Sequence, residues 1–165
     1  MKKIIFAIIL TVLISGAVFA DYPGGFGIGV QGGYGGIGGA GGVTFKIPSI
    51  PVFFVIDFFD ITTTSFGLSG AGDYYLFHNE IVNPLDWYFG IGVGVSFWNS
   101  SNSAGLAAAI RAPLGLSWQP INFLELYLQA VPQVGLRFFG NDGNNSGFGL
   151  WSNFWCGNLG IRFWF

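Results

Sequence analysis

Apolar and polar residues alternate along much of the chain. The clearest case is the stretch "WYFGIGVGVSF", in which one apolar row contains Trp87, Phe89, Ile91, Val93, Val95 and Phe97. The residues between them are Tyr88, Gly90, Gly92, Gly94 and Ser96. A repeat of two places successive side chains on opposite faces, which is typical of a β-strand and not of a helix.

The same alternation predicts eight strands along the chain. We place them at residues 26–34, 42–47, 52–60, 68–78, 87–97, 105–118, 123–139 and 155–165. The segments between them are rich in Gly, Asn, Pro and Asp, as turns are. They comprise residues 35–41, 48–51 ("PSIP"), 61–67, 79–86, 98–104, 119–122 ("QPIN") and a longest connection that begins with the polar loop 140–147.

Two prolines fall inside these strands. Pro113 and Pro132 each lack the N–H group that a strand interior needs for its ladder. A closed barrel has no free edge at which such a residue is tolerated. We therefore expect a bulge or an unpaired carbonyl at each proline.

The composition indicates what solvent these strands meet. Charged residues make up 8% of the chain, against about 25% in ordinary soluble domains. Aromatic residues reach 19%, and the mean hydropathy is +0.58. In hydrocarbon every backbone N–H and C=O must be paired within the protein, so strands cross a membrane only as a closed barrel. The fold predicted is all-β: an eight-stranded antiparallel up-and-down transmembrane β-barrel.

The first twenty residues read as a secretory signal. Lys2 and Lys3 precede an apolar run, and Val18 and Ala20 are small residues before a cut. We predict a signal peptide at residues 1–20 and the outer-membrane barrel at residues 21–165; a retained anchor helix is the alternative. The single cysteine, Cys156, forms no intramolecular disulfide and lies too far from the cut to anchor a lipid.

The phase of the strands also predicts a charged interior. Seven charged side chains fall on the inward face: Lys46, Asp57, Asp73, Arg111, Glu125, Arg137 and Arg162. An eight-stranded barrel is narrow enough for side chains to fill, and an unpaired charge there is costly. We expect the three arginines to pair with Glu125, Asp57 and Asp73. This network is either a structural core or a charged path for a small solute.

Aromatic residues mark where the strands leave the membrane. We assign Tyr34 and Phe97 to the outer rim, Trp118 and Phe123 to a periplasmic turn, and Trp155 to the interface opposite Phe165.

The sequence offers little for catalysis. The single histidine, His78, lies near the periplasmic end of its strand, and a "GYGGIG" match at 33–38 has no helix after it. No Cys, His and carboxylate residues have metal-ligand spacing, and no basic stripe suggests nucleic acid. We expect no enzyme, no cofactor, no metal and no nucleic-acid partner.

Four segments resemble the small eight-stranded bacterial outer-membrane barrels typified by the OmpA transmembrane domain and OmpX, and poorly characterised barrels like them. They are "WYFGIGVGV", "RAPLGLSW", "LELYLQAVP" and "LGIRFWF". The resemblance covers residues 68–165 best. It implies a location in the bacterial outer membrane and contact with outer-membrane lipid. It also implies that Ile161, Phe163 and Phe165 form the C-terminal signal read by the barrel-assembly machinery, with periplasmic chaperones as earlier partners.

Three functions are compatible with this sequence. The first is a monomeric structural or surface-interaction protein, active in adhesion or envelope integrity, whose lumen is filled by side chains. The second is a narrow, porin-like or OmpW-like passage for small or hydrophobic solutes. The third, a lipid-modifying enzyme using His78, has the least support, because His78 is placed at the wrong end of the barrel.

Overall fold

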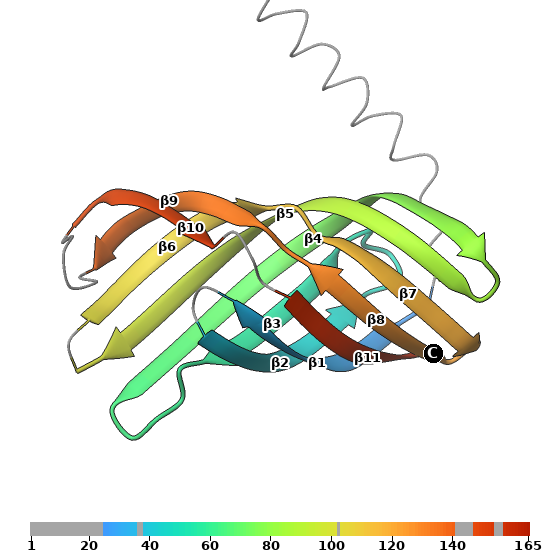
Figure 1. Ribbon diagram of the computed structural model, residues 1–165, viewed down its shortest axis with the longest axis horizontal. Helices are drawn as coiled ribbons and strands as arrows, with labels where there is room; N and C mark the ends of the chain where they lie inside the picture. Colours follow the sequence, from blue (N-terminus) through green and yellow to red (C-terminus); the bar gives the residue numbers. More distant parts are fainter. Residues whose placement is uncertain (1–24, 36–37, 102, 141–146, 154–156) are drawn as a thin grey trace, which may run out of the picture.

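One closed antiparallel sheet makes up the fold. The computed structural model describes residues 25–35, 38–101, 103–140, 147–153 and 157–165. Its strands are β1 (Gly27–Gly35), β2 (Gly38–Lys46), β3 (Phe53–Phe59), β4 (Ser65–Val82), β5 (Leu85–Ser100), β6 (Ser103–Arg111), β7 (Leu114–Ile121), β8 (Leu124–Ala130), β9 (Gln133–Gly140), β10 (Gly149–Asn153) and β11 (Gly157–Trp164). Their order is β10-β9-β6-β5-β4-β3-β2-β1-β11-β8-β7, and the pairing of β5 with β7 closes the ring (Figure 1).

These eleven strands make eight passes of the barrel wall. β6 and β7 are two segments of one pass, and so are β8 and β9, and β10 and β11. Each pass pairs with the passes before and after it, and β1 pairs with β11 from Gly27↔Trp164 to Tyr34↔Gly157. The prediction of an all-β, eight-stranded, antiparallel up-and-down barrel is therefore confirmed. The predicted signal peptide, residues 1–20, lies outside the described residues. Within the described ranges, no helix is both long and apolar enough to cross a bilayer.

The two ends of the barrel differ. The connections β2–β3, β4–β5 and β7–β8 lie at the end that carries Phe165, which we call the terminal end. The connections β1–β2, β3–β4, β5–β6 and β9–β10 lie at the opposite end, which we call the loop end (Figure 1). β4 and β5 have 18 and 16 residues, whereas β1 and β2 have 9 each, so the loop-end rim is uneven.

Apolar side chains cover the exterior, and charged ones lie inside. The six buried charged residues, each at most 6% exposed, are Lys46, Asp73, Arg111, Glu125, Arg137 and Arg162. Their strand neighbours of opposite phase, such as Ile110, Leu136 and Phe163, are exposed. These charged side chains therefore lie on the inward faces of their strands, because a repeat of two fixes both faces of a strand once one face is known.

A bulge in β4 changes that phase once. The register with β5 shifts between Tyr75 and Phe77, and both Tyr75 and Leu76 are buried. An extra residue on one strand turns the following side chain to the other face. Phe77 consequently lies on the exterior, where its ring stacks on Phe89 with centroids 6.4 Å apart.

Several predicted turns are wrong in length. Residues 35–41 are not a long turn, since Gly35 pairs directly with Gly38 and the strand continues through the glycines. Backbone hydrogen bonds need no side chain, so glycines extend a ladder whose partners are in place. The predicted turns at 79–86 and 98–104 also shorten, because β4 runs to Val82, β5 covers Leu85–Ser100 and β6 begins at Ser103. The long connection after residue 140 contains β10, which pairs with β9.

The two prolines interrupt their strands without shifting the register. Gly92↔Arg111 and Phe89↔Leu114 belong to one continuous register, so Gly90 lies opposite Pro113. Gly90 donates its N–H to the Pro113 carbonyl at 2.8 Å, and Ala112 donates to the Pro132 carbonyl at 3.1 Å. Neither proline has an N–H with which to return the bond. We expected either a bulge or an unpaired carbonyl at each proline. The register has no bulge there; instead, the carbonyl opposite each proline lacks the N–H donor that another residue would provide.

Candidate functional site in the barrel interior

The interior near the terminal end is organised around Glu125. Arg162, its cross-strand partner, lies with Nη1 2.8 Å from Glu125 Oε2. The Trp164 indole donates to the same oxygen at 2.9 Å, and the Ser117 hydroxyl donates to Oε1 at 2.9 Å. Arg162 Nη2 donates to the Thr44 hydroxyl at 3.1 Å. Glu125 is fully buried and Arg162 is 2% exposed, so each charge is compensated by the other and by neutral hydrogen bonds.

Aromatic rings surround this ion pair. The Arg162 guanidinium carbon lies 4.6 Å from the ring centroids of both Phe53 and Tyr127. Phe53 stacks on Tyr75 with centroids 4.3 Å apart, and Tyr75 stacks on Tyr88 at 4.5 Å. Cation–π contacts of this kind gain strength when the cation is removed from water. The rings therefore fill the lumen and also stabilise the buried arginine.

A second ion pair lies further towards the loop end. Asp73 on β4 and Arg111 on β6 are both cross-strand partners of Gly92 on β5. Arg111 Nε lies 2.8 Å from Asp73 Oδ1, and both side chains are buried. A side chain at Gly92 would collide with the Asp73 carboxylate, so this glycine provides the space in which the pair forms.

Two amide side chains accept hydrogen bonds from buried tyrosines, and one of them also binds the carboxylate of Asp57. The Tyr127 hydroxyl donates to Gln31 Oε1 at 2.9 Å. Gln31 Nε2 in turn donates to the two oxygens of Asp57 at 2.8 and 3.0 Å. The Tyr88 hydroxyl donates to Gln129 Oε1 at 2.9 Å. These hydrogen bonds connect side chains on four passes of the barrel, those that contain β1, β3, β5 and β8.

Four of the seven charged residues assigned to the interior form ion pairs with each other. The structure brings Arg111 to Asp73 and Arg162 to Glu125. It places Asp57 against Gln31, and Arg137 donates through Nε to the Gly147 carbonyl at 3.1 Å. Lys46 is buried with its ammonium 6.0 Å from the Phe53 ring centroid.

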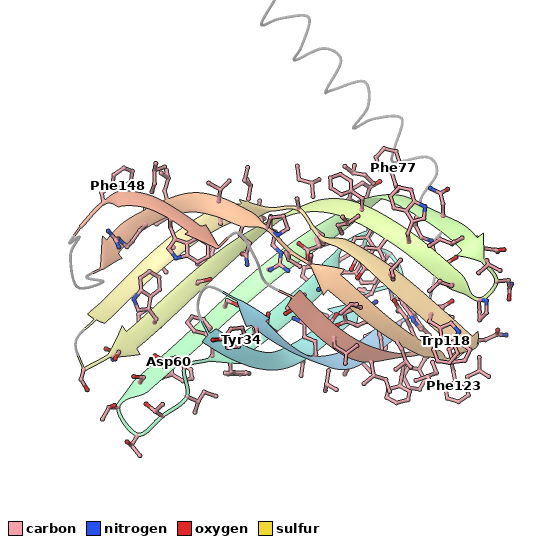
Figure 2. All side chains as sticks on the ribbon, viewed as in Figure 1. Tyr34, Asp60, Phe77, Trp118, Phe123 and Phe148 are labelled. Atoms are coloured by element: carbon pink, nitrogen blue, oxygen red, sulfur yellow. The ribbon has the colours of Figure 1, made fainter. Side chains whose placement is uncertain are left out.

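The predicted interface aromatics lie on the exterior. Trp118 and Phe123 are exposed near the terminal end, and Tyr34 is exposed at the loop-end tip of the short β1 (Figure 2). Phe97 is exposed near the loop end of β5. Trp155 lies outside the described residues.

The C-terminal residues close the barrel seam. Phe165 exchanges two backbone hydrogen bonds with Phe26, of 2.8 and 3.0 Å. Its ring is 79% exposed, and Phe163 is exposed on the same face, with Ile161 half-buried. The three residues proposed as an assembly signal therefore form an exterior row at the terminal end.

His78 lies against Asp86 near the terminal end of the barrel. Its Nε2 is 3.4 Å from Asp86 Oδ2 in the β4–β5 hairpin, whereas Asp73 on the same strand faces Arg111. In the described part of the chain, no group of three or more His, Cys, Asp or Glu residues could hold a metal ion.

Sequence reasoning missed the neutral half of the interior. Tyr75, Tyr88, Tyr127 and Trp164 are all buried there. A signal was present, because small residues face the large ones: side chains at Gly115 and Gly160 would collide with the Tyr88 and Tyr127 rings, respectively. Large aromatics at inward positions, matched by glycines on neighbouring strands, indicate a filled lumen.

Comparison with known proteins gives a family and two similar solved structures. A family model described as "Protein of unknown function (DUF3996)" matches residues 32–163. The N-terminal β-barrel domain of Pseudomonas aeruginosa OprF superposes with a TM-score of 0.56 at 15% identity, over 87% of this chain and 98% of that one. Neisserial surface protein A (NspA) gives a TM-score of 0.46 at 13% identity, over 85% and 97% of the two chains. Among curated proteins, none matches the sequence. The likeness to the OprF domain supports the barrel fold.

Proposed function

Since this chain belongs to DUF3996, a family described as of unknown function, we propose a function from its own side chains. It is an integral protein of the bacterial outer membrane, in which the barrel is a structural element with a side-chain-filled lumen and presents its loop end for contacts at the cell surface. The observation that carries the proposal is that charged and apolar side chains are distributed in the reverse of the order found in soluble proteins. The Asp73–Arg111 and Glu125–Arg162 ion pairs are buried, whereas Phe, Ile, Leu and Val cover the outside.

The exterior supports the membrane location. Exposed large apolar side chains occur on every pass of the barrel. A soluble protein that exposes such a surface aggregates, whereas a barrel in hydrocarbon requires it. Exposed Trp118, Phe123 and Phe165 at the terminal end fit an aromatic girdle at the membrane surface.

The filled interior favours a structural role over transport. The Arg162 cluster and the Tyr75–Tyr88 stack occupy the lumen near the terminal end, and the Asp73–Arg111 pair lies beyond them. A solute crossing the barrel would have to separate buried charges that are in contact, which costs several kcal/mol.

Two measurements test this function on the full chain. Folded barrels resist denaturation in detergent, so the unboiled protein should migrate differently from the boiled protein on a gel. Identical migration would contradict the barrel in its membrane-protein form. In planar bilayers we expect no conductance from the folded protein, and stable channel steps would replace the structural role with a transport role.

A further inference from the structure

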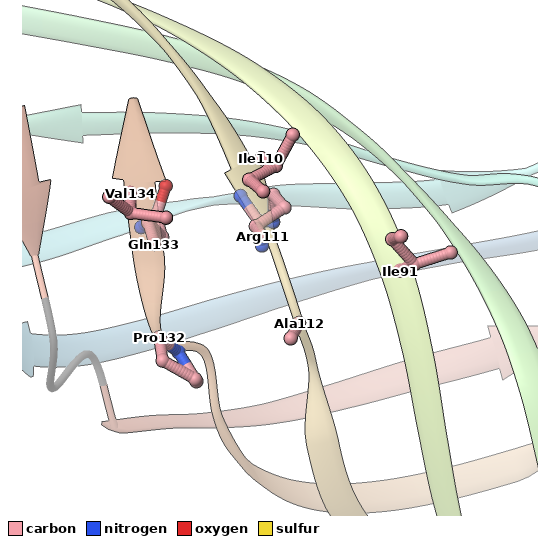
Figure 3. Close-up of a pocket in the computed structure, with 7 residues that line it drawn as sticks. All are labelled: Ile91, Ile110, Arg111, Ala112, Pro132, Gln133 and Val134. Atoms are coloured by element: carbon pink, nitrogen blue, oxygen red, sulfur yellow. The ribbon is translucent and has the colours of Figure 1, made fainter. Parts of the chain in front are cut away.

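Two hollows on the exterior flank the interrupted strands. The first, which we call the upper hollow, has a volume of about 200 Å³ and is lined by Ile91, Ile110, Ala112, Pro132 and Val134, among others. Figure 3 shows Ile110, Arg111 and Ala112 along one strand, with Pro132, Gln133 and Val134 on the next and Ile91 on the other side. The second, the lower hollow, has a volume of about 500 Å³ and includes Trp87, Leu114, Leu116, Leu128 and Ala130.

The sequence explains why the wall is hollowed here. Ala112 and Ala130 occupy outward positions at which other strands carry Ile, Leu or Phe. Pro132 lies opposite Ala112, and neither side chain extends far from the wall. The taller neighbours Ile110 and Leu114, on either side of the interruption, are exposed and form the edges of the hollows.

The chemistry of this surface selects an apolar occupant. The exposed lining residues Ile91, Ile110 and Val134 above, and Leu114, Leu116 and Leu128 below, are all aliphatic. The one charged residue at the upper hollow, Arg111, is buried and directs its Nε to Asp73 in the interior. A protein partner bound from water would normally find a polar rim, whereas an alkyl chain needs none.

The position of the hollows indicates how a bound alkyl chain is oriented relative to the membrane surface. Trp87 lies opposite Leu116, and Leu85 lies opposite Trp118, close to the terminal-end connection of β4 and β5. Tryptophan prefers the headgroup level of a membrane. From Trp87 the lining residues continue along the wall to Val134 on β9, so they follow the direction in which a lipid chain extends.

We propose that the upper and lower hollows together bind one acyl chain of a membrane lipid, with its headgroup beside Trp87 at the terminal end. This inference rests on the proposed membrane location and adds a specific lipid site to it. Pro132 lines the upper hollow, and the small side chains of Ala112 and Ala130 leave room for the chain.

The test fills the hollows and counts retained lipid. The full-length barrel, the double variant Ala112→Leu/Ala130→Leu and the control Ala108→Leu are reconstituted in nanodiscs of palmitoyl-oleoyl phosphatidylglycerol. Ala108 is also an outward alanine on β6, but it lines neither hollow. Native mass spectrometry after transfer to detergent measures lipid bound per chain. We expect the double variant to retain about two- to threefold less lipid, a modest change because a lipid chain exchanges hydrocarbon only for better packing. The control should match wild type.

Three other outcomes distinguish failure of the proposed function from failure of the lipid site. If the wild-type chain does not enter nanodiscs, the proposed function fails and this inference fails with it. Equal lipid retention by all three folded proteins overturns the lipid site alone. A wild-type dimer that the double variant converts to monomer also overturns it, because the hollows would then be covered by a second copy.

If the double variant does not fold, a second measurement tests the lipid site without substitutions that fill the hollows. Trp87 lines the lower hollow, whereas Trp118 is exposed at the same end but lines neither hollow. The fluorescence of each tryptophan is obtained as the difference between wild type and the variant Trp87→Phe or Trp118→Phe. In bilayers containing bromine-labelled phosphatidylglycerol, the fluorescence of Trp87 should be quenched at a lower fraction of labelled lipid than that of Trp118. Equal quenching of the two tryptophans would overturn the proposal.

Discussion

Arg162 and Glu125 face each other across β11 and β8, 2.8 Å apart and sealed from solvent. Removing one charge leaves the other buried without compensation, which typically costs about 3–5 kcal/mol. We therefore expect Glu125→Gln to lower the free energy of unfolding by about that amount, although glutamine keeps the shape of the side chain. Urea unfolding in lipid vesicles, followed by tryptophan fluorescence, measures it. Glu80→Gln, at an exposed position on β4, is the control and should leave the unfolding curve in place.

The same pair should show strong coupling in a double variant. Arg162→Met removes the cation. Glu125→Gln keeps one oxygen to accept from the Trp164 indole, and its NH2 group can donate to the Ser117 hydroxyl, which reverses its role. The double variant should be more stable than the sum of the two single losses implies, by about 1–3 kcal/mol. A double-mutant cycle on the vesicle-folded protein gives this coupling energy. A coupling near zero would mean that each charge is compensated by water or by other groups.

The sequence predicts this interior only in part, for a physical reason. Alternation fixes the face on which Arg162 and Glu125 lie, because the repeat of a strand is two. It does not fix the cross-strand register, which depends on turn lengths and on the stagger of the closed sheet. Hence the inward position of each charge could be predicted individually, whereas which arginine pairs with which carboxylate could not. Arg137 donates to a loop carbonyl, a contact that no periodicity indicates.

Local irregularities limit sequence reasoning in the same way. The bulge at Tyr75 and Phe77 turns Phe77 outward, although apolar residues on both sides of it give no sign of an extra residue. β10 lies after a polar, glycine-rich stretch and contains only five residues, so its alternation is too short to distinguish from a loop.

Inward glycines should be intolerant of even a methyl group. A Cβ at Gly160 would overlap the Tyr127 ring, whose hydroxyl bonds to Gln31. Gly160→Ala should therefore destabilise the barrel by about 1–3 kcal/mol, as overpacking of a filled core does. Its control is Gly32→Ala, on the exterior, where the nearest atom to a Cβ is the Ala40 carbonyl oxygen at 3.9 Å. Since alanine loses less backbone entropy than glycine, we expect the control to be neutral or slightly more stable. Equal losses in both variants would show that the Tyr127 ring moves aside.

Restoring the missing donor at Pro113 should add a hydrogen bond to the barrel wall. Gly90 donates to the Pro113 carbonyl, and the reciprocal bond to the Gly90 carbonyl needs an N–H at position 113. Pro113→Ala provides it, and one added hydrogen bond contributes about 0.5–1.5 kcal/mol. This gain is offset because alanine makes the unfolded chain more flexible than proline does, and because the fully buried Pro113 ring leaves an unfilled space. Vesicle unfolding should therefore show a small net change, and the new amide should exchange slowly with deuterium. Fast exchange at position 113 would mean that the strand stays interrupted for another reason.

The Phe165 ring and the Phe165 backbone should have separable roles. The backbone closes the seam through its two hydrogen bonds with Phe26, and Phe165→Ala keeps both of them. Refolding of this variant into lipid vesicles should therefore proceed as in wild type. If the exposed ring is read by the barrel-assembly machinery, as we propose for Ile161, Phe163 and Phe165, the amount of folded variant in the outer membrane of cells should fall several-fold. Phe123→Ala is the matched control, since it removes another exposed ring at the same end. If the two variants accumulate equally in cells, the ring at position 165 contributes only lipid contact, and recognition must depend on residues further along the row.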